Sequence, residues 1–431
     1  RSGRAQQEVP EVRFHRPFRR LTIPLVAASL VLASCSSGGG TSSTAPGGSG
    51  TPISPGDKTF LVGAALPLTG ALAANGKEQR DGYELWKDAI NAKGGIQVGS
   101  DHYKVDIKYY DYQSDTTTAV RLTEKLITQD KVQAVLGPYG SGATEAASAI
   151  TEQYGIPMLS PSGAAKTLFN KGYKYLFATL VGLDTVAKQI MDFSASLDPA
   201  PKSIGLIVRN DLFPTAQATA ILAEAKARNL DVVYNEQFPP DTTDLSTILL
   251  GAKSANPDFL IGLGYVNDLI LMTKQARELK LTPKAFLQTA GPSHYSFIPA
   301  VKQDGENVLT VDWWAPQLAY SDDDKLLGSA TDYAKAFEDK FSYVPSYISA
   351  SATACGYLIQ RAAELAGSVD PKAMRDALAS FDEETFYGHI KFDAGGQNVG
   401  TPVVIEQILG GKIVTVFPTD VATETAHHPF E

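Results

Sequence analysis

The chain has 431 residues, of which 43% are hydrophobic and 20% charged, and its formal net charge is -9. This length exceeds that of one ordinary compact domain, and the composition is typical of a soluble globular protein, so we expect two lobes. The acidic balance excludes nucleic acid as a partner, because phosphate binding requires a basic face and no basic cluster occurs after residue 34.

The N-terminus predicts the export signal of a lipoprotein. Six arginines precede an apolar run from Leu21 to Leu32, which is too short to remain as a membrane-spanning helix. Small residues then precede Cys35, as suits cleavage by a lipoprotein signal peptidase. We therefore expect residues 1–34 to be removed and Cys35 to carry lipid at the outer face of a bacterial cell membrane. A non-lipidated secretory signal is the alternative. Loss of six arginines and two glutamates would change the formal charge from -9 to -13.

Residues 35–57 consist almost entirely of Ser, Gly, Thr, Pro and Ala, which cannot bury a core, so this segment predicts a flexible tether. The folded body is expected to begin near Lys58. The second cysteine, Cys355, lies in an apolar helical run and is expected to be a buried inert thiol. If Cys35 carries lipid, no internal disulfide is possible.

From residue 59 onward, short β-rich runs alternate with amphipathic segments, a rhythm that indicates βαβ units around parallel sheets. The first set comprises strands 59–66, 104–110, 133–136 and 156–159 and helices 79–91, 117–129 and 141–154. After residue 180 the rhythm restarts with strands 203–208, 231–237, 259–262 and 285–288 and helices 215–227, 245–252 and 269–279. The two sets predict an α/β fold with two doubly wound parallel-sheet lobes.

The last part of the chain predicts helices over 332–341 and 348–366 and strands over 389–392, 403–409 and 413–417. These late elements must complete the earlier lobes, so the chain is expected to cross between lobes near Leu180, Asp312 and Thr385. The predicted organisation is residues 58–180 and 313–385 in lobe 1, residues 181–312 and 386–420 in lobe 2, and a tail over 421–431.

Five short motifs occur in a specific order: Leu-Pro-Leu-Thr-Gly at 66–70, Ile-Asn-Ala-Lys-Gly-Gly-Ile at 90–96, Gly-Pro-Tyr-Gly-Ser at 137–141, Tyr-Gly-Ile-Pro at 154–157 and Ser-Pro-Ser at 160–162. Over roughly residues 58–417, the chain resembles the leucine/isoleucine/valine-binding family of ABC-importer substrate-binding proteins. The resemblance implies a type I periplasmic binding protein clamshell with a three-strand hinge. It also implies ligand capture in the cleft, delivery to an ABC permease, no catalysis and no cofactor. We expect a monomer.

The carboxylate-binding half of the expected site centres on Ser141. This residue would begin a helix directly after a buried strand, where free N–H groups and the helix dipole favour a ligand carboxylate. In the family that this chain resembles, the corresponding serine and the turn after the next strand hold that carboxylate, which maps onto Ser141, Ser162 and Ala164. The local alternative is that Ser141 caps its helix and Ser162 shapes a turn.

The other walls of the expected cleft are aromatic. Tyr265 matches a family tyrosine that closes over the ligand, and it follows a strand at the end where ligands of open α/β sheets bind. Tyr139, Phe213 and Trp313 are expected to add apolar walls, although each also suits a core or hinge position. Where the family has a further cleft tyrosine, this chain has Asn75.

This chain departs from the family at the positions where family members bind the ammonium group of an amino acid. Branched-chain binders place threonine at Ala164 and a glutamate at Ala290 or a neighbour. An unpaired buried ammonium costs several kcal/mol, so an amino-acid ligand would need another carboxylate, for which the candidates are Asp184, Asp268 and Asp312. The family's small-loop disulfide is also missing, because Ser114 and Gly140 occupy those places.

The sequence thus predicts a small carboxylate-bearing ligand with an apolar or aromatic body, either an amino acid or an aromatic or aliphatic acid. A hydrolase is disfavoured, because Tyr139 replaces the leading glycine of a nucleophile elbow around Ser141. A dinucleotide site is disfavoured because Asn267 replaces the third glycine, and no metal-ligand cluster occurs. A ligand-sensing receptor domain for a signalling partner, which would use the same clamshell, stays open as the alternative.

Overall fold

The structure of the protein is a computed structural model that describes residues 58–321 and 326–430. The predicted signal, the tether and Cys35 lie outside these residues. Within the described residues, no helix combines the length and apolarity needed to cross a bilayer.

The first lobe is built on a seven-stranded sheet in the order β14-β6-β5-β4-β1-β3-β2. All neighbouring strands run parallel except β2, which pairs antiparallel with β3 at one edge. Its first elements are β1 Lys58–Leu66, α1 Ala73–Ala92, β2 Ile96–Val98, β3 Asp101–Asp111, α2 Thr116–Thr128, β4 Ala134–Leu136, α3 Ser141–Tyr154, β5 Met158–Ser160 and β6 Leu176–Val181.

The second lobe repeats this plan with a sheet in the order β16-β15-β11-β10-β9-β7-β8. Here the pairs β11–β15 and β15–β16 are antiparallel, and the other pairs are parallel. The elements are α4 Leu183–Ser196, β7 Ser203–Arg209, α5 Leu212–Ala227, β8 Asp231–Phe238, α6 Ser246–Ala255, β9 Phe259–Leu263, α7 Val266–Glu278, β10 Ala285–Thr289, α8 Phe297–Val301 and β11 Leu309–Asp312.

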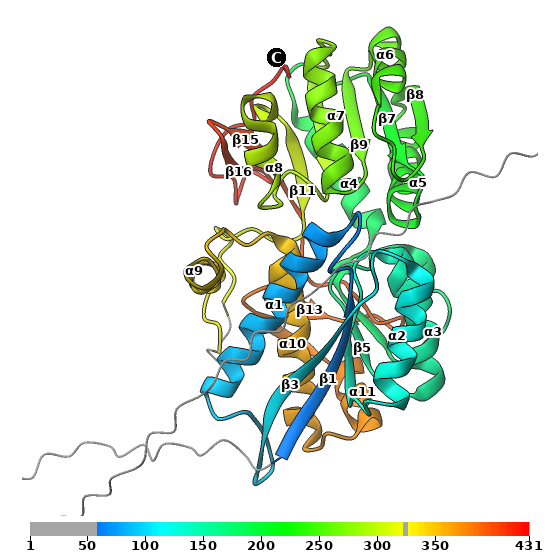
Figure 1. Ribbon diagram of the computed structural model, residues 1–431. Helices are drawn as coiled ribbons and strands as arrows, with labels where there is room; N and C mark the ends of the chain where they lie inside the picture. Colours follow the sequence, from blue (N-terminus) through cyan, green and yellow to red (C-terminus); the bar gives the residue numbers. More distant parts are fainter. Residues whose placement is uncertain (1–57, 322–325, 431) are drawn as a thin grey trace, which may run out of the picture. The chain divides into compact units, whose positions relative to one another are not determined.

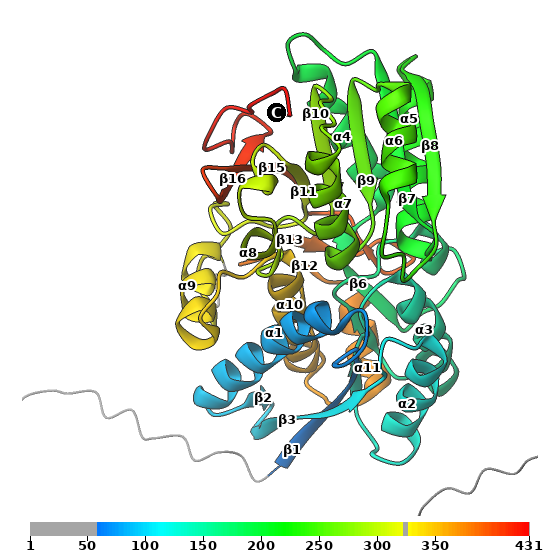
Figure 2. The ribbon, with the colours of Figure 1, turned by 45° about the horizontal axis from the view of Figure 1, so that its top comes forward.

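After β11 the chain returns to the first lobe and then to the second. The returning elements are α9 Ala330–Phe341, α10 Tyr347–Ala366, α11 Pro371–Ala379, the hairpin β12 Asp382–Thr385 and β13 Gly388–Lys391, β14 Gln397–Asn398, β15 Val404–Leu409 and β16 Lys412–Phe417. Helix α10 packs along α1 (Figure 1). Together they cover one face of the first sheet, while α2 and α3 cover the other (Figure 2).

The strand pairing bears on the predicted lobe boundaries, which stay a prediction. Strand β14 pairs with β6 of the first sheet, whereas β15 pairs with β11 of the second. We therefore propose that the last crossing lies after Asn398 instead of near Thr385. The predicted tail packs on the second lobe, because Phe430 is buried there and its N–H donates to the carbonyl of Pro283.

The core of each lobe explains why these segments form strands and helices. The parallel strands β4, β5, β6, β9 and β10 are buried along their whole length, as expected for a sheet covered by helices on both faces. Cys355 on α10 is buried, and burial raises the pKa of its thiol well above the ordinary value. The prediction that this thiol is buried is confirmed.

Candidate functional site

Helix α3 begins at Ser141, directly after β4 and a glycine-containing turn. Gly140 has φ +84°, a conformation that L residues rarely adopt, and it lets the chain turn sharply into the helix. The first helical bond runs from the Thr144 N–H to the Gly140 carbonyl. The N–H groups of Ser141, Gly142 and Ala143 are therefore outside the helical hydrogen-bond pattern, and the positive end of the helix dipole lies at this point.

The Ser141 hydroxyl links the start of α3, which follows β4, to the turn that follows β5. Its oxygen accepts hydrogen bonds from the N–H groups of Ala164 and Ala165, each at 3.2 Å. Because a hydroxyl that accepts hydrogen bonds becomes a stronger donor, its own O–H is prepared to donate to an anion. Ser162 accepts from the Gly140 N–H at 2.9 Å and donates to the Pro138 carbonyl at 3.2 Å. Ser141, Ser162 and Ala164 thus lie together, as the sequence predicted, and Ser162 also shapes the turn.

Tyr265 approaches this turn from the second lobe. It follows β9 and is the N-cap of α7, and its N–H donates to Asp268 at 2.9 Å. Its ring makes an edge contact with Tyr139 of the first lobe, with ring centres 5.8 Å apart. A Cβ on Gly140 would stand 3.3 Å from the Tyr265 hydroxyl, so a glycine allows this close approach without displacing the tyrosine.

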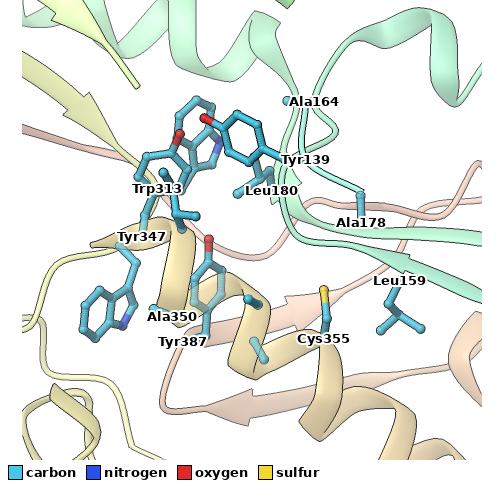
Figure 3. Close-up of a cluster of buried hydrophobic side chains, with 14 of the residues drawn as sticks. Tyr139, Leu159, Ala164, Ala178, Leu180, Trp313, Tyr347, Ala350, Cys355 and Tyr387 are labelled. Carbon is cyan, nitrogen blue, oxygen red and sulfur yellow. The ribbon is translucent and has the colours of Figure 1, made fainter. Parts of the chain in front are cut away.

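The other predicted aromatic residues continue from Tyr265 toward the hinge. The ring of Phe213 stacks on that of Tyr265, with ring centres 6.3 Å apart, and its centre lies 6.3 Å from that of Trp313. The ring centres of Trp313 and Tyr347 are 5.0 Å apart. Figure 3 shows Tyr139, Trp313, Tyr347 and Tyr387 in one buried cluster. Trp313 also donates to the Val181 carbonyl at 3.2 Å, which joins two segments that cross between the lobes.

Neither Asn75 nor Ala290 supplies a charge to a ligand. The Asn75 amide donates to the Tyr139 hydroxyl at 3.0 Å, and its Oδ1 has no hydrogen-bond partner within the described part of the chain. Ala290 follows β10, is buried and has φ +63°. None of the three residues after it is acidic. The glutamate expected of a branched-chain binder is therefore not replaced by a neighbour.

The three predicted ammonium partners lie in different environments. Asp184 is mostly exposed and pairs with Lys166 at 2.9 Å. Asp268 is buried and accepts two hydrogen bonds from Arg209, at 2.9 and 3.1 Å, and burial raises the pKa of its carboxyl although Arg209 favours ionisation. Asp312 is buried and accepts a hydrogen bond from the Ser293 hydroxyl at 2.9 Å.

A cavity of about 250 Å³ lies between the two lobes, beside the start of α3 and Tyr265. We call it the cleft cavity. It is lined by Ala71, Leu72, Tyr112, Ser114, Thr116, Tyr139, Gly140, Gly142, Ala143, Arg209, Asp211, Pro240, Asp241 and Tyr265. Of the nine predicted ligand residues, Tyr139 and Tyr265 line this cavity, together with Gly140, Gly142 and Ala143 at the start of α3. The lining also includes three charged residues that the sequence analysis missed. Arg209 is the last residue of β7 and Asp211 follows it by two residues, so the strand-end rule that selected Tyr265 could have selected them too.

Asp312 belongs to a second group of ionisable side chains between the lobes. We call Glu78, His294, Asp312 and Glu406 the buried acid cluster. Glu78 of α1 faces His294 of the second lobe at 3.2 Å, and both side chains are fully buried. Burial lowers the pKa of His294, despite the opposing charge of Glu78. Burial raises the pKa of Asp312 to about 6, and burial together with Asp312 raises that of Glu406.

A larger cavity of about 490 Å³ borders the buried acid cluster. His294, Glu406, Tyr343 and Tyr295 line it, and none of the nine predicted ligand residues does. Among the described residues, no three His, Cys, Asp or Glu side chains gather in a way that could hold a metal ion. The start of α3 and Tyr265 therefore mark the cleft cavity, the smaller of the two, as the candidate site.

Residues 59–412 match the model of a protein family described as periplasmic binding protein. The chain belongs to this family. A curated relative, Leu/Ile/Val-binding protein homolog 8 of Brucella abortus (strain 2308), is 28% identical over 378 residues, which span 84% of this chain and 91% of the relative. These matches confirm the predicted resemblance to the leucine/isoleucine/valine-binding family and the predicted two-lobed α/β fold.

Solved structures agree with this membership. The branched-chain amino acid transporter substrate binding protein LivJ from Streptococcus pneumoniae, in complex with isoleucine, superimposes with a TM-score of 0.75 at 27% identity, over 83% of this chain and 98% of that one. A solute binding protein from R. palustris in complex with benzoate gives a TM-score of 0.71 at 20% identity, over 83% of this chain and 95% of that one. The second likeness extends to the fold alone.

Proposed function

We propose that the protein is the extracytoplasmic solute-binding lipoprotein of an ABC importer. It captures a small carboxylate-bearing ligand, an amino acid or an aromatic or aliphatic acid, between its two lobes. The observation that carries this proposal is the cleft cavity, in which the start of α3 in one lobe faces Tyr265 of the other. Family membership and the amino-acid and benzoate complexes of similar structures support a small carboxylate as the ligand.

The proposed mechanism is capture by closure. The ligand carboxylate accepts hydrogen bonds from the free N–H groups at the start of α3 and from the Ser141 hydroxyl, at the positive end of the helix dipole. Tyr265 and Phe213 then cover the ligand from the second lobe, so that the contacts are complete only when both lobes engage it. Binding energy is thus coupled to the lobe arrangement that a permease recognises.

A thermal-shift screen of amino acids and of aromatic and aliphatic carboxylates tests the ligand class, because a ligand that binds only the folded state raises the melting temperature. The best ligand is then titrated calorimetrically into the native protein and into Ser141→Ala. We expect a loss of about 10- to 100-fold in affinity, because a hydrogen bond to a charged group contributes roughly 1.5 to 3 kcal/mol. Ser148→Ala, on the same helix and bonded only to the Glu145 carbonyl, is the control. Stabilisation by uncharged compounds alone would contradict the carboxylate assignment.

Attachment through Cys35 is tested separately. Cells that express the native chain should retain it in the membrane fraction, whereas Cys35→Ser should release it in soluble form, because removal of the lipid leaves no anchor. Identical fractionation of the two proteins would contradict lipidation and leave the ligand proposal intact.

A further inference from the structure

The wall of the cleft cavity formed by the second lobe carries an unmatched hydrogen-bond donor. Arg209 is 7% exposed and lines the cavity. Its Nη1 donates to both oxygens of Asp268, but its Nε is buried and has no hydrogen-bond partner in residues 58–321 and 326–430. A buried N–H group without a partner costs about 1 to 3 kcal/mol, so this position favours a ligand atom that accepts a hydrogen bond.

An acceptor stands beside this donor. Asp211 caps α5 through Oδ1, which accepts the Leu212 N–H at 2.7 Å. The other oxygen, Oδ2, lies 3.6 Å from Nε of Arg209, which is too far for a hydrogen bond. The cavity wall therefore presents a donor and an acceptor side by side, and neither satisfies the other.

The start of α3 lies across the cavity from this pair. Gly142, whose N–H is outside the helical pattern, is close enough that a Cβ built on it would be 3.7 Å from Oδ1 of Asp211. Gly142 and Ala143 line the same cavity as Arg209 and Asp211, so a ligand whose carboxylate binds at the start of α3 can also reach this pair. Tyr139 and Tyr265 line the cavity as well and add aromatic surface for a short carbon chain.

We propose that Arg209 and Asp211 form a distal subsite for a carboxamide group, so that the preferred ligand is a short acid with a terminal amide. This inference rests on the proposed function, because it assumes that the carboxylate binds at the start of α3. The amide oxygen accepts from Nε of Arg209, and the amide NH₂ donates to Oδ2 of Asp211.

Other distal groups satisfy only part of this pair. A terminal carboxylate accepts from Arg209 but faces the negative charges of Asp211 and Asp241. A terminal ammonium pairs with Asp211 but leaves the Arg209 N–H facing another donor. An alkyl end leaves both protein groups desolvated and unpaired. A site built for a polar group rejects the analogue that lacks it far more strongly than an apolar pocket rejects an added methylene.

The test uses the full chain and four acids of similar length, each with and without an α-amino group. The distal groups are carboxamide (glutaramate, glutamine), carboxylate (glutarate, glutamate), ammonium (5-aminopentanoate, ornithine) and alkyl (5-methylhexanoate, homoleucine). Calorimetric titration should give the carboxamide the highest affinity in at least one series, at least about tenfold above the alkyl acid. Alkyl acids that bind as tightly as the amides would overturn the subsite and leave the proposed function standing.

Two variants test whether Asp211 causes the preference for a carboxamide. In Asp211→Asn, the side-chain oxygen can still cap α5, and its NH₂ then faces the cavity as a donor. The affinity ratio of carboxamide to carboxylate should fall by at least about tenfold. Asp231→Asn, an exposed residue of the same lobe that does not line the cleft cavity, is the control and should leave this ratio unchanged within about threefold. Equal ratios in the native protein and in Asp211→Asn would overturn the proposal.

Pentanamide, which has no carboxylate, tests the two ends of the site separately. If it binds as tightly as glutaramate, the distal subsite stands and the carboxylate assignment fails.

Discussion

The two polar regions between the lobes differ in how their charges are satisfied. In the buried acid cluster, the Glu78 carboxylate accepts from the Ser346 N–H at 3.0 Å and the Ser349 hydroxyl at 3.2 Å, and it faces His294 from the other lobe. In the cleft cavity, Arg209 and the start of α3 line space that a ligand can occupy, and Nε of Arg209 has no hydrogen-bond partner among the described residues. Among the described residues both regions keep unpartnered buried polar atoms: Glu78 Oε2, His294 Nε2 and Asp312 Oδ2 in the cluster, and Arg209 Nε in the cleft cavity. They differ because Glu78 is held by two hydrogen bonds from the protein, whereas Arg209 lines a cavity together with the start of α3. Substitutions in the first should therefore change stability, and substitutions in the second should change affinity.

The largest expected effect is the loss of stability in Glu78→Ala. Removal of the buried carboxylate leaves the Ser346 N–H without its acceptor and takes away one of the two acceptors of the Ser349 hydroxyl. It also removes the charge that faces His294, and together these losses should lower the free energy of unfolding by about 3 kcal/mol. Urea unfolding measures this value. Glu78→Gln keeps one acceptor oxygen and should lose less, and the exposed Asp339→Ala should change stability by less than about 0.5 kcal/mol. A change in ligand preference without a loss of stability would break the comparison.

The second prediction concerns pH and Asp312. Because the pKa of Asp312 is raised to about 6, the folded protein keeps a proton that the unfolded chain releases near its ordinary pKa of about 4. The free energy of unfolding should therefore fall as the pH rises through this window, by up to about 2 to 3 kcal/mol. Asp312→Asn should remove much of this fall, so that the variant gains stability relative to the native protein between about pH 4 and pH 6.5.

Two neighbours bear on the Asp312 measurement. The lowered pKa of His294 acts in the opposite sense, because stability is lost as the pH falls below its ordinary value of about 6.5. This contribution is present in both proteins and cancels in the difference. Glu406, whose pKa is also raised, acts in the same sense as Asp312. A difference in stability that does not vary with pH would show that Asp312 is ionised in the folded protein throughout the window.

A smaller effect is expected from Gly140→Ala, at the edge of the cleft cavity. The new methyl group would lie 3.3 Å from the Tyr265 hydroxyl, and an L residue at φ +84° is strained. Affinity for the best ligand should fall by about tenfold. Gly172→Ala is the matched control, because Gly172 also has a positive φ, +74°, but nothing lies within 4 Å of its Cβ position. Both variants should lose stability, and only Gly140→Ala should lose affinity. Equal affinities would place Tyr265 outside the closure contact.

The smallest effect is expected for Asp184→Asn. Its carboxylate is mostly exposed, pairs with Lys166 and does not line the cleft cavity, so affinity should change by less than about twofold. Titration with an amino acid and with the matching acid that lacks the α-amino group provides the measurement. A selective loss of amino-acid affinity would restore Asp184 as the ammonium partner.

Local patterns in the sequence were sufficient for most of the fold. The predicted bounds of the helix at 141–154 coincide with those of α3, because a glycine precedes the helix and another follows it. Helix α1, by contrast, begins at Ala73, six residues before the predicted start, because its first turns contain Asn75 and Gly76, which have low helix propensity. Gly76 is held there by packing, since a Cβ would stand 2.2 Å from the Pro67 carbonyl oxygen. Strand β6 and helices α4 and α11 were not predicted.

The sequence by itself determined the two-lobed α/β fold and the burial of Cys355, because strand periodicity and glycine-containing turns are local. The grouping of Ser141, Ser162 and Ala164 followed from the resemblance to the family. Only the tertiary structure decided which charges pair. It matched Arg209 with Asp268 and Glu78 with His294, and it left Asp211 in the cleft cavity. These partners are distant in sequence and meet only when the strands of each sheet align and the lobes face one another. The chemistry of the site therefore depends on contacts that no local pattern contains.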